Sequence, residues 1–140
     1  MSRLIYFCSV QYPELSNFYP CSIEYEGDTY SSVETAYQAS KFPKAEREKF
    51  LSLSPKEARK FKKQAPPRSR REDYAVMRIL LTKKFECGIL RQYLENTRDA
   101  TLVHWAPWDT FWGFSQQNGG KNILGRLLMN IREKNRNEGG

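Results

Sequence analysis

The order of hydrophobic patterns along the chain predicts short strands first and mostly helices after them. Strands are expected where apolar residues alternate or form a short run between turn residues. The stretches of this kind are residues 4–8, 22–26, 29–30 and 101–105, with a hairpin turn at Gly27-Asp28. Helices are expected where apolar residues recur every third or fourth position, at residues 31–41, 44–51, 55–65, 72–85, 90–96 and 121–136. Strands followed by helices indicate an α+β fold rather than βαβ units.

The length of 140 residues suits one domain with a normal hydrophobic core. We expect a compact, mostly helical domain over residues 1–136, with a small N-terminal strand and hairpin region and a frayed tail at residues 137–140. In the helix expected at residues 72–85, apolar side chains at helical spacing predict the face that packs on the core. They are Tyr74, Met77, Leu81 and Phe85.

The helix expected at residues 31–41 carries a polar stripe where a core-facing helix would carry leucines. Residues three and four apart share one face of a helix. The polar residues that share this face are Glu34, Tyr37, Gln38 and Lys41. A carboxylate and an amine held close together on a rigid element are the groups of an acid–base or nucleophilic site.

Both charged residues of this stripe also have ordinary structural interpretations. Ser31 and Glu34 match a capping box, in which the carboxylate only satisfies a backbone amide at the helix start. Lys41 near the helix end is favourable to the helix dipole. A second capping box, at Ser54-Pro55-Lys56-Glu57, has proline at the first helical position and predicts the start of another helix.

The chain carries a net charge of +7, because 23 Lys and Arg residues outnumber 16 Asp and Glu residues. Much of the excess lies between residues 56 and 71. A basic run of this kind can meet the phosphates of a nucleotide or a nucleic acid, or can be a solvated helix face with a basic loop. The run includes Lys56, Arg59, Lys60, Lys62, Lys63, Arg68, Arg70 and Arg71.

Membrane, secreted and metal-binding classes receive no support from the sequence. No apolar run approaches the roughly 20 residues of a membrane helix, and the first residues lack the apolar stretch of a signal peptide. We therefore expect a cytoplasmic protein without a membrane partner. The widely spaced Cys8, Cys21 and Cys87 and the single His104 form no metal-ligand pattern, so neither a metal nor a cofactor is expected.

Aromatic side chains are concentrated between Trp105 and Trp112, in a segment without a helical or strand pattern. Such side chains either fill the core or line a pocket. Asp109 lies among them and is a candidate acid or base, although aspartate in a loop commonly caps a turn. Further on, Gly119-Gly120 precede the last helix and form a candidate anion-binding site, because helix N-terminal amides can hold phosphate.

A series of short motifs runs in order through about residues 15–132 of the sequence. The motifs are Ser16-Asn17-Phe18-Tyr19, Tyr30-Ser31-Ser32-Val33-Glu34 with Tyr37-Gln38 and Lys41, Met77, Lys84-Phe85, Leu90 through Leu94 with Thr97, Asp109 through Trp112-Gly113, Gly120-Lys121-Asn122-Ile123-Leu124-Gly125, Leu128-Met129 and Ile131-Arg132. This ordered set resembles the NADAR (YbiA-like) N-glycosidase family.

The resemblance implies a YbiA-like fold and an enzyme that hydrolyses N-glycosyl compounds. The expected bond joins a base or amine nitrogen to a ribose phosphate or ADP-ribose group. The expected substrates are riboflavin-pathway intermediates or ADP-ribosylated guanine, free or carried on nucleic acid. By resemblance, the catalytic residues are Glu34, Lys41 and Asp109. The substrate-binding residues implied in the same way are Asn17, Phe18, Tyr37, Gln38, Trp112, Gly113 and Asn122.

Two chemical routes and one other function stay open. Glu34 can stabilise an oxocarbenium-like state or activate water, with Asp109 donating a proton to the leaving nitrogen. Alternatively, the amine of Lys41 can attack a ring-opened ribose and form a Schiff base. The alternative function is a module that binds ADP-ribose, another nucleotide or nucleic acid without cleaving it, since positive charge and aromatic side chains suit both functions.

Overall fold

The computed structural model describes residues 3–139, which divide into two compact units. The terminal unit contains residues 3–16 and 85–139, and the central unit contains residues 17–84. The described residues form five α-helices, four short strands and several 3-10 helices. The α+β class predicted from the sequence is therefore confirmed.

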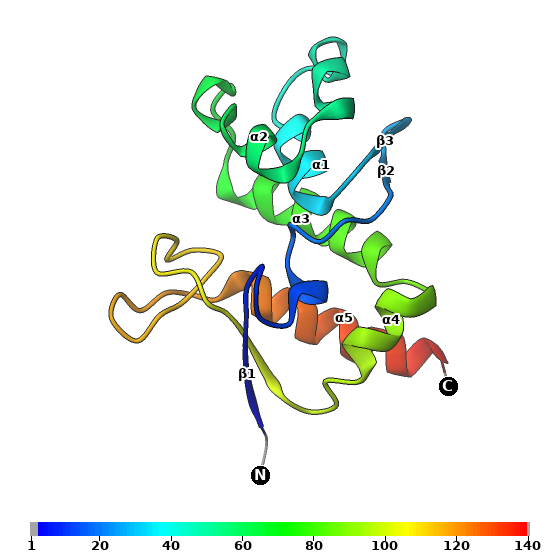
Figure 1. Cartoon of the computed structure of the whole chain (residues 1–140), viewed down its shortest axis with the longest axis vertical. Coiled ribbons are helices and arrows are strands. Elements are labelled where there is room, and N and C mark those ends of the chain that lie inside the picture. The colour runs from blue at the N-terminus through cyan, green and yellow to red at the C-terminus, as the bar shows by residue number, and fades with distance from the viewer. Residues whose placement is uncertain (1–2, 140) are drawn as a thin grey trace. The chain divides into compact units, whose positions relative to one another are not determined.

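A two-stranded parallel sheet organises the terminal unit. β1 (Leu4–Phe7) pairs with β4 (Thr101–His104), close to the strands predicted there. α5 (Ile123–Gly139) packs on β4, and α4 (Gly88–Glu95) lies beside α5 (Figure 1). Buried apolar side chains from these elements form the core of the unit, among them Ile5, Phe7, Leu94, Leu102, Leu124 and Leu128.

The start of α5 is held by a close approach to β4. The side-chain amide of Asn122 donates to the carbonyl of Leu102 (2.9 Å) and accepts from the backbone amide of His104 (2.9 Å). A Cβ atom on Gly125 would lie 2.2 Å from the Leu102 carbonyl oxygen, so only glycine fits at this contact. Asn122 has a positive φ of 53°, which is not helical, so α5 begins at Ile123 rather than at residue 121. It continues to Gly139, past the predicted end at residue 136.

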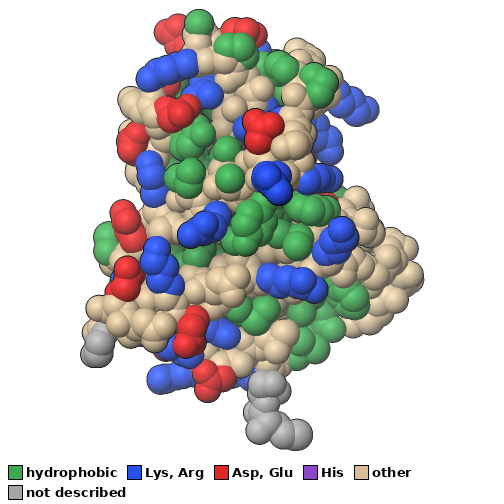
Figure 2. All heavy atoms as spheres, turned by 180° about the vertical axis from the view of Figure 1, so that it is seen from behind, with side chains coloured by type: hydrophobic (Ala, Val, Ile, Leu, Met, Phe, Trp, Pro, Cys, Tyr) green, Lys and Arg blue, Asp and Glu red, His purple; other side chains and the backbone are tan. Residues whose placement is uncertain are grey.

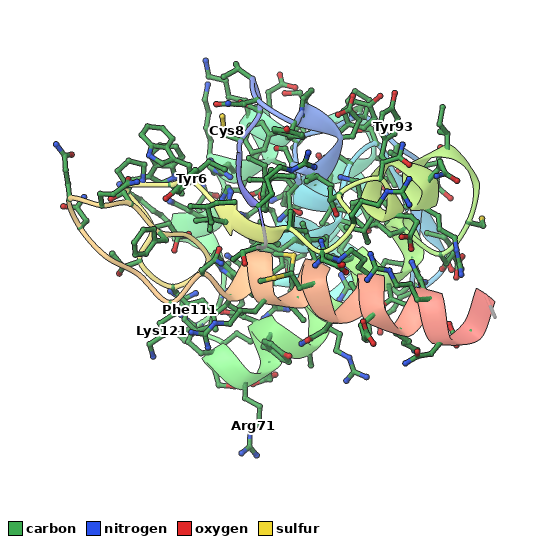
Figure 3. All side chains as sticks on the ribbon, turned by 90° about the horizontal axis from the view of Figure 1, so that it is seen from below. Tyr6, Cys8, Arg71, Tyr93, Phe111 and Lys121 are labelled. Carbon is green, nitrogen blue, oxygen red and sulfur yellow. The ribbon has the colours of Figure 1, made fainter. Side chains whose placement is uncertain are left out.

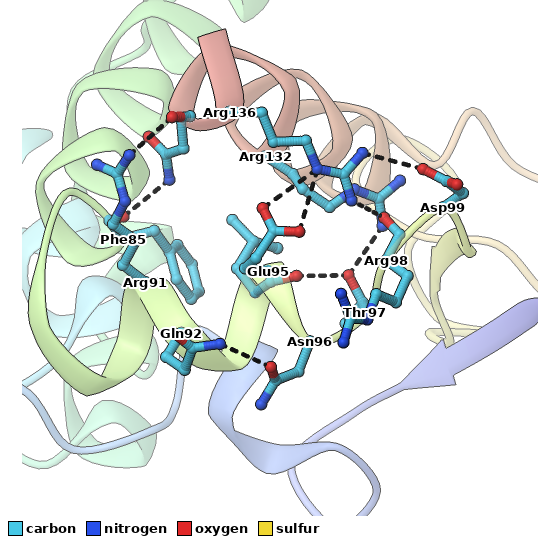
Figure 4. A network of polar contacts seen from close by, with 12 residues as sticks. Phe85, Arg91, Gln92, Glu95, Asn96, Thr97, Arg98, Asp99, Arg132 and Arg136 are labelled. Atoms are coloured by element: carbon cyan, nitrogen blue, oxygen red, sulfur yellow. Dashed lines mark hydrogen bonds and ion pairs between the residues drawn. The ribbon is translucent and has the colours of Figure 1, made fainter. Parts of the chain in front are cut away.

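Arginine side chains of α5 form hydrogen bonds and ion pairs with residues at and just after the end of α4 (Figure 4). Arg136 donates to the carboxylate of Glu95 (3.1 Å) and to that of Asp99 (3.0 Å). The buried Arg132 donates to the hydroxyl of Thr97 (2.8 Å). Because the carbonyl groups at a helix C-terminus favour positive charge, these arginines stabilise the end of α4.

In the central unit, a β-hairpin leads directly into a short helix. β2 (Ile23–Tyr25) pairs antiparallel with β3 (Asp28–Tyr30), and α1 (Val33–Ser40) follows. α2 (Pro55–Arg59) and α3 (Arg70–Lys84) both pack against α1 (Figure 1). The 3-10 helices of the two units are η1 (Pro13–Leu15), η2 (Lys44–Glu46), η3 (Glu48–Ser52) and η4 (Lys62–Gln64).

The hairpin turn lies one residue earlier than predicted. Its two central residues are Glu26 and Gly27, with φ angles of 49° and 94°, whereas Asp28 pairs with Tyr25 in the ladder. Two consecutive positive φ angles are the requirement of a type I′ turn, which matches the twist of the flanking strands. The prediction of a turn at Gly27-Asp28 was therefore wrong by one position.

Three helix predictions also differ from the structure. The stretch 44–51 forms η2 and η3 instead of one α-helix, and the helix that begins at Pro55 ends at Arg59. On α3, Met77 and Leu81 are buried as predicted, but Tyr74 is 36% exposed. Tyr74 lies near the first turn of α3, where its ring reaches solvent.

α1 is buried along its whole length, from Val33 to Ser40. Its N-cap is Ser32, whose hydroxyl accepts from the backbone amide of Thr35 (3.1 Å). The predicted capping box with Glu34 is therefore wrong, and the Glu34 carboxylate takes side-chain partners instead. The second predicted capping box is confirmed, because Ser54 and Glu57 exchange both hydrogen bonds.

The net positive charge belongs mainly to the central unit. Lys and Arg residues clearly outnumber Asp and Glu residues there, whereas the two kinds are almost balanced in the terminal unit. Figure 2 shows Lys and Arg side chains spread among apolar side chains on one face. No helix within residues 3–139 combines the length and the apolar character that a membrane span needs.

Candidate active site

The carboxylate of Glu34, in the first turn of α1, is the centre of a candidate site in the central unit. Glu34 is only 4% exposed, and its Oε2 accepts from Nε2 of Gln38 at 2.7 Å. The Arg59 guanidinium approaches the two carboxylate oxygens at 3.4 Å each. Charge-assisted contacts are usually about 2.7–2.9 Å, so this ion pair is loose. The carboxylate is thus oriented by Gln38 and retains capacity to accept further hydrogen bonds.

Arg59 belongs to the basic run noted in the sequence, but its pairing with Glu34 was not predicted. Its guanidinium carbon lies 4.4 Å from the centroid of the Phe18 ring, and its side chain is 40% exposed. The ring and the Glu34 carboxylate together hold the guanidinium in place. Arg59 is separated from Glu34 by 25 positions. No local periodicity relates residues that far apart, so only the fold reveals the pair.

Two buried amide side chains of this site have unpaired oxygen atoms. Asn17 is 8% exposed and Gln38 is 3% exposed. Within the described part of the chain, Oδ1 of Asn17 and Oε1 of Gln38 have no hydrogen-bond partner. Asn17 lies next to Glu34, because the backbone amide of Glu34 donates to the carbonyl of Asn17 (3.0 Å). Leaving a buried acceptor unpaired costs about 1–3 kcal/mol, so both oxygens suit a ligand that carries hydrogen-bond donors.

The amine of Lys41, directly after α1, is the candidate nucleophile. Its Nζ lies 4.7 Å from the centroid of the Tyr37 ring, and within residues 3–139 it forms no hydrogen bond or ion pair. Desolvation lowers the pKa of Lys41, although the carboxylates of Asp73 and Glu34 oppose this effect. Burial also raises the pKa of the Tyr37 phenol, which stays protonated. A lowered pKa increases the fraction of uncharged amine, which is the nucleophilic form.

Asp109 organises the aromatic loop of the terminal unit. Its Oδ1 accepts from the backbone amides of Phe111 (3.0 Å) and Trp112 (2.9 Å). Asp109 is therefore engaged in turn capping, the structural alternative for this residue. Trp112 is 8% exposed and packs edge-on against Phe111, with ring centroids 4.8 Å apart. A Cβ atom on Gly113 would lie 2.6 Å from that of Ala106, so this glycine serves close packing.

The tryptophans of the loop divide between the core and the surface. Trp112 is buried, whereas Trp105 is 40% exposed and Trp108 is 68% exposed. Trp105 borders a surface hollow of about 420 Å³ that Tyr6 and Cys8 also line; Figure 3 labels both of these residues. Both outcomes expected for the aromatic segment, core filling and pocket lining, are therefore present.

The predicted anion-binding site at Gly119-Gly120 is not formed. The backbone amides before and at the start of α5 donate to the carbonyl groups of residues 110–113, so they are not available to an anion. These amides belong to Lys121, Asn122, Ile123 and Leu124. A Cβ atom on Gly120 would lie 2.2 Å from the Gly113 carbonyl oxygen, so this glycine permits close packing of the loop.

The site residues predicted from the sequence lie partly in the central unit and partly in the terminal unit. The central unit contains Asn17, Phe18, Glu34, Tyr37, Gln38 and Lys41. The terminal unit contains Asp109, Trp112, Gly113 and Asn122. Of these, Asn122 uses its side-chain amide to bind β4. No group of three His, Cys, Asp or Glu side chains within residues 3–139 could hold a metal ion, and the three cysteines are free thiols.

Comparison with protein families gives a match to the NADAR domain over residues 6–136. N-glycosidase Npun_R5314 of Nostoc punctiforme is 34% identical over 95% of this chain and 93% of its own length. N-glycosidase YbiA of Escherichia coli (strain K12) is 36% identical over 92% of this chain and 85% of its own length. Riboflavin biosynthesis protein VVA0006 of Vibrio vulnificus is 34% identical, and the chain spans 35% of its length.

A solved structure is also similar to the chain. The NMR structure of the E. coli protein YbiA matches with a TM-score of 0.84 and 35% sequence identity. The match covers 99% of this chain and 89% of the YbiA chain. The YbiA-like fold expected from the sequence is therefore confirmed.

Substitution of Asp109 tests the turn that the structure assigns to it. Asp109→Ala removes the acceptor of two backbone amides, so the free energy of unfolding should fall by about 1–2 kcal/mol. Asp109→Asn keeps a side-chain oxygen and should lose less than half as much. Denaturant unfolding of both variants measures the difference, and equal losses would contradict the capping role.

Proposed function

Because the chain belongs to the NADAR domain family, we propose that it hydrolyses the bond between a base or amine nitrogen and the C1 carbon of a ribose phosphate or ADP-ribose group. The broader class, a hydrolase of N-glycosyl compounds, rests on relatives that are named N-glycosidases and are 34% and 36% identical to the chain. The Vibrio relative's name makes a riboflavin-pathway intermediate one candidate substrate, and ADP-ribosylated guanine is the other.

The buried carboxylate of Glu34 is the observation that carries this proposal. Cleavage of an N-glycosidic bond develops positive charge on the ribose carbon, and a nearby carboxylate stabilises that charge or activates water. In a site shielded from water this attraction is stronger than in solution. Gln38 orients the carboxylate, while the long contacts to Arg59 leave its charge only partly neutralised.

The unpaired oxygens of Asn17 and Gln38 support a sugar as the bound group. Hydroxyl groups of ribose are hydrogen-bond donors and would satisfy these buried acceptors. A substrate that pairs them recovers the free energy lost by burying them unpaired. The same pairing would orient the ribose next to Glu34.

Lys41 supports a covalent form of the reaction. Its uncharged amine would add to C1 as the bond from C1 to the base nitrogen breaks, and the base would leave with a proton. Opening of the ring at the C1–O4 bond, with a proton passing from the amine to O4, gives an imine that water hydrolyses to free sugar and free amine. The half-buried position and lowered pKa of Lys41 suit this role.

Replacement of the carboxylate tests the proposed function directly. The wild-type protein should release free base from ADP-ribosylated guanosine or from the pyrimidine ribose phosphate of the riboflavin pathway, as measured by mass spectrometry. Glu34→Gln keeps one acceptor oxygen for Gln38 but removes the negative charge, and it should lower the rate by on the order of 10²–10⁴. The exposed Glu48→Gln is the control with the same chemical change and should keep full activity.

Two results would contradict this assignment. Tight binding of both substrates without base release would identify a binding module instead of an enzyme. Full activity of Glu34→Gln would remove the carboxylate from the reaction, even if the wild-type protein is a glycosidase.

Borohydride trapping separates the covalent route from direct hydrolysis. If Lys41 forms an imine with the sugar, borohydride reduces it to a stable amine, and mass spectrometry of peptides should place the sugar adduct on Lys41. The adduct should be absent from Lys41→Met and from samples without substrate. An active Lys41→Met variant, together with no adduct on the wild-type protein, would exclude the covalent route and leave hydrolysis assisted by Glu34.

A further inference from the structure

Arg68 is anchored on two sides in the central unit. Its Nε donates to Oδ1 of Asp73 at 2.7 Å, and its Nη1 donates to the carbonyl (3.0 Å) and hydroxyl (3.1 Å) oxygens of Ser40. The Arg68 side chain is 13% exposed and that of Asp73 is 10% exposed. Three hydrogen bonds therefore hold this guanidinium in one orientation. The rigid fork of donors in arginine then fixes the direction of the remaining nitrogen.

The remaining nitrogen of the guanidinium, Nη2, is unpaired in the described part of the chain. Nη2 of Arg68 is buried and has no hydrogen-bond partner among residues 3–139. A buried charged donor without an acceptor is costly, and such groups are normally paired. The unpaired donor therefore indicates that an acceptor is supplied from outside the chain.

Arg68 reaches the last residue of α1, directly before the candidate nucleophile Lys41. Ser40, which accepts two of its hydrogen bonds, directly precedes Lys41. The guanidinium carbon lies 5.7 Å from the centroid of the Tyr37 ring, and Nζ of Lys41 lies 4.7 Å from the same centroid. The unpaired donor thus belongs to the same neighbourhood as Lys41.

Charge near Arg68 favours an anion over a neutral ligand. Asp73 is its carboxylate partner, but Arg70 also approaches Asp73, at 3.7 Å. Lys41 lies nearby and forms no ion pair with any residue of the described range 3–139. Asp73 is thus approached by both guanidinium groups, and the Arg68 guanidinium stays positively charged, so its unpaired donor suits an anionic oxygen.

We propose that Arg68 binds a phosphate oxygen of the substrate through Nη2, with Asp73 as the residue that positions it. This inference rests on the proposed function, because it names the residue that anchors the phosphate of the ribose phosphate. The unpaired atoms of the central unit fit such a ligand. Asn17 and Gln38 offer acceptors for hydroxyl groups, and Arg68 offers a donor for an anionic oxygen.

Binding of the product sugar tests the role of Arg68 without turnover. Calorimetry should show that the wild-type protein binds ribose 5-phosphate much more tightly than ribose. Loss of a charge-assisted hydrogen bond should weaken phosphate binding in Arg68→Met by about 10- to 100-fold and leave ribose binding nearly unchanged. Arg71→Met is the matched control, since Arg71 is exposed, carries the same charge and points away from α3 in Figure 3. It should bind both sugars as the wild-type protein does.

A second variant covers the case in which the Arg68→Met protein fails to fold because the buried Asp73 has lost its nearest partner. Arg68→Met/Asp73→Leu removes both charges, and thermal unfolding establishes that it is folded. The same selective loss of phosphate binding is expected. If a folded variant without Arg68 keeps the wild-type preference for ribose 5-phosphate over ribose, or if the wild-type protein shows no such preference, the proposal is overturned.

The outcome for Arg68 is distinguishable from the outcome for the proposed function. Selective phosphate binding through Arg68 without base release from any substrate would reject the glycosidase and keep the phosphate site. Base release together with phosphate binding that does not depend on Arg68 would reject the phosphate site and keep the glycosidase.

Discussion

The complete burial of α1 is the constraint on which the central unit depends. A helix enclosed on all sides would ordinarily carry apolar side chains, yet two of the buried side chains of α1 are Glu34 and Gln38. Each buried polar group must find a partner or lower the stability of the fold. Glu34 finds Gln38 and Arg59, whereas the oxygens of Gln38 and Asn17 have no partner in the described chain. This arrangement is costly for a structural helix and appropriate for a binding site.

The same burial sets the chemistry of the cations around the helix. Desolvation disfavours the charged form of Lys41, so an amine that would be inert on the surface becomes a candidate nucleophile. Arg68 cannot respond in this way, because a guanidinium stays charged in proteins. It is held instead by Asp73 and Ser40, with one donor left over. The amine of Lys41 can lose its charge and the guanidinium of Arg68 cannot. The amine therefore suits a reaction with the substrate, and the guanidinium suits binding of an anionic group.

Local sequence signals predicted the elements well and their long-range contacts poorly. The spacing of Glu34, Tyr37, Gln38 and Lys41 was sufficient to place them together, because helical periodicity is local. The N-cap of α1 was assigned to the wrong serine, since both Ser31 and Ser32 fit the motif. The backbone pairing of Ser31 with Cys21 selects Ser32 as the cap. Arg59, Arg68 and the bonding of Asn122 to β4 depend on residues distant in sequence, so no periodicity revealed them.

The central claim is that the unpaired oxygens beside Glu34 belong to a sugar-binding site. The most direct measurement is a titration of ¹⁵N-labelled protein with ribose 5-phosphate, followed through the side-chain amide signals in NMR spectra. The account predicts saturable shifts that are largest for the side-chain amides of Asn17 and Gln38, with little change for the structural amide of Asn122. Saturable shifts that leave Asn17 and Gln38 unchanged, or no shifts at millimolar sugar phosphate, would contradict it.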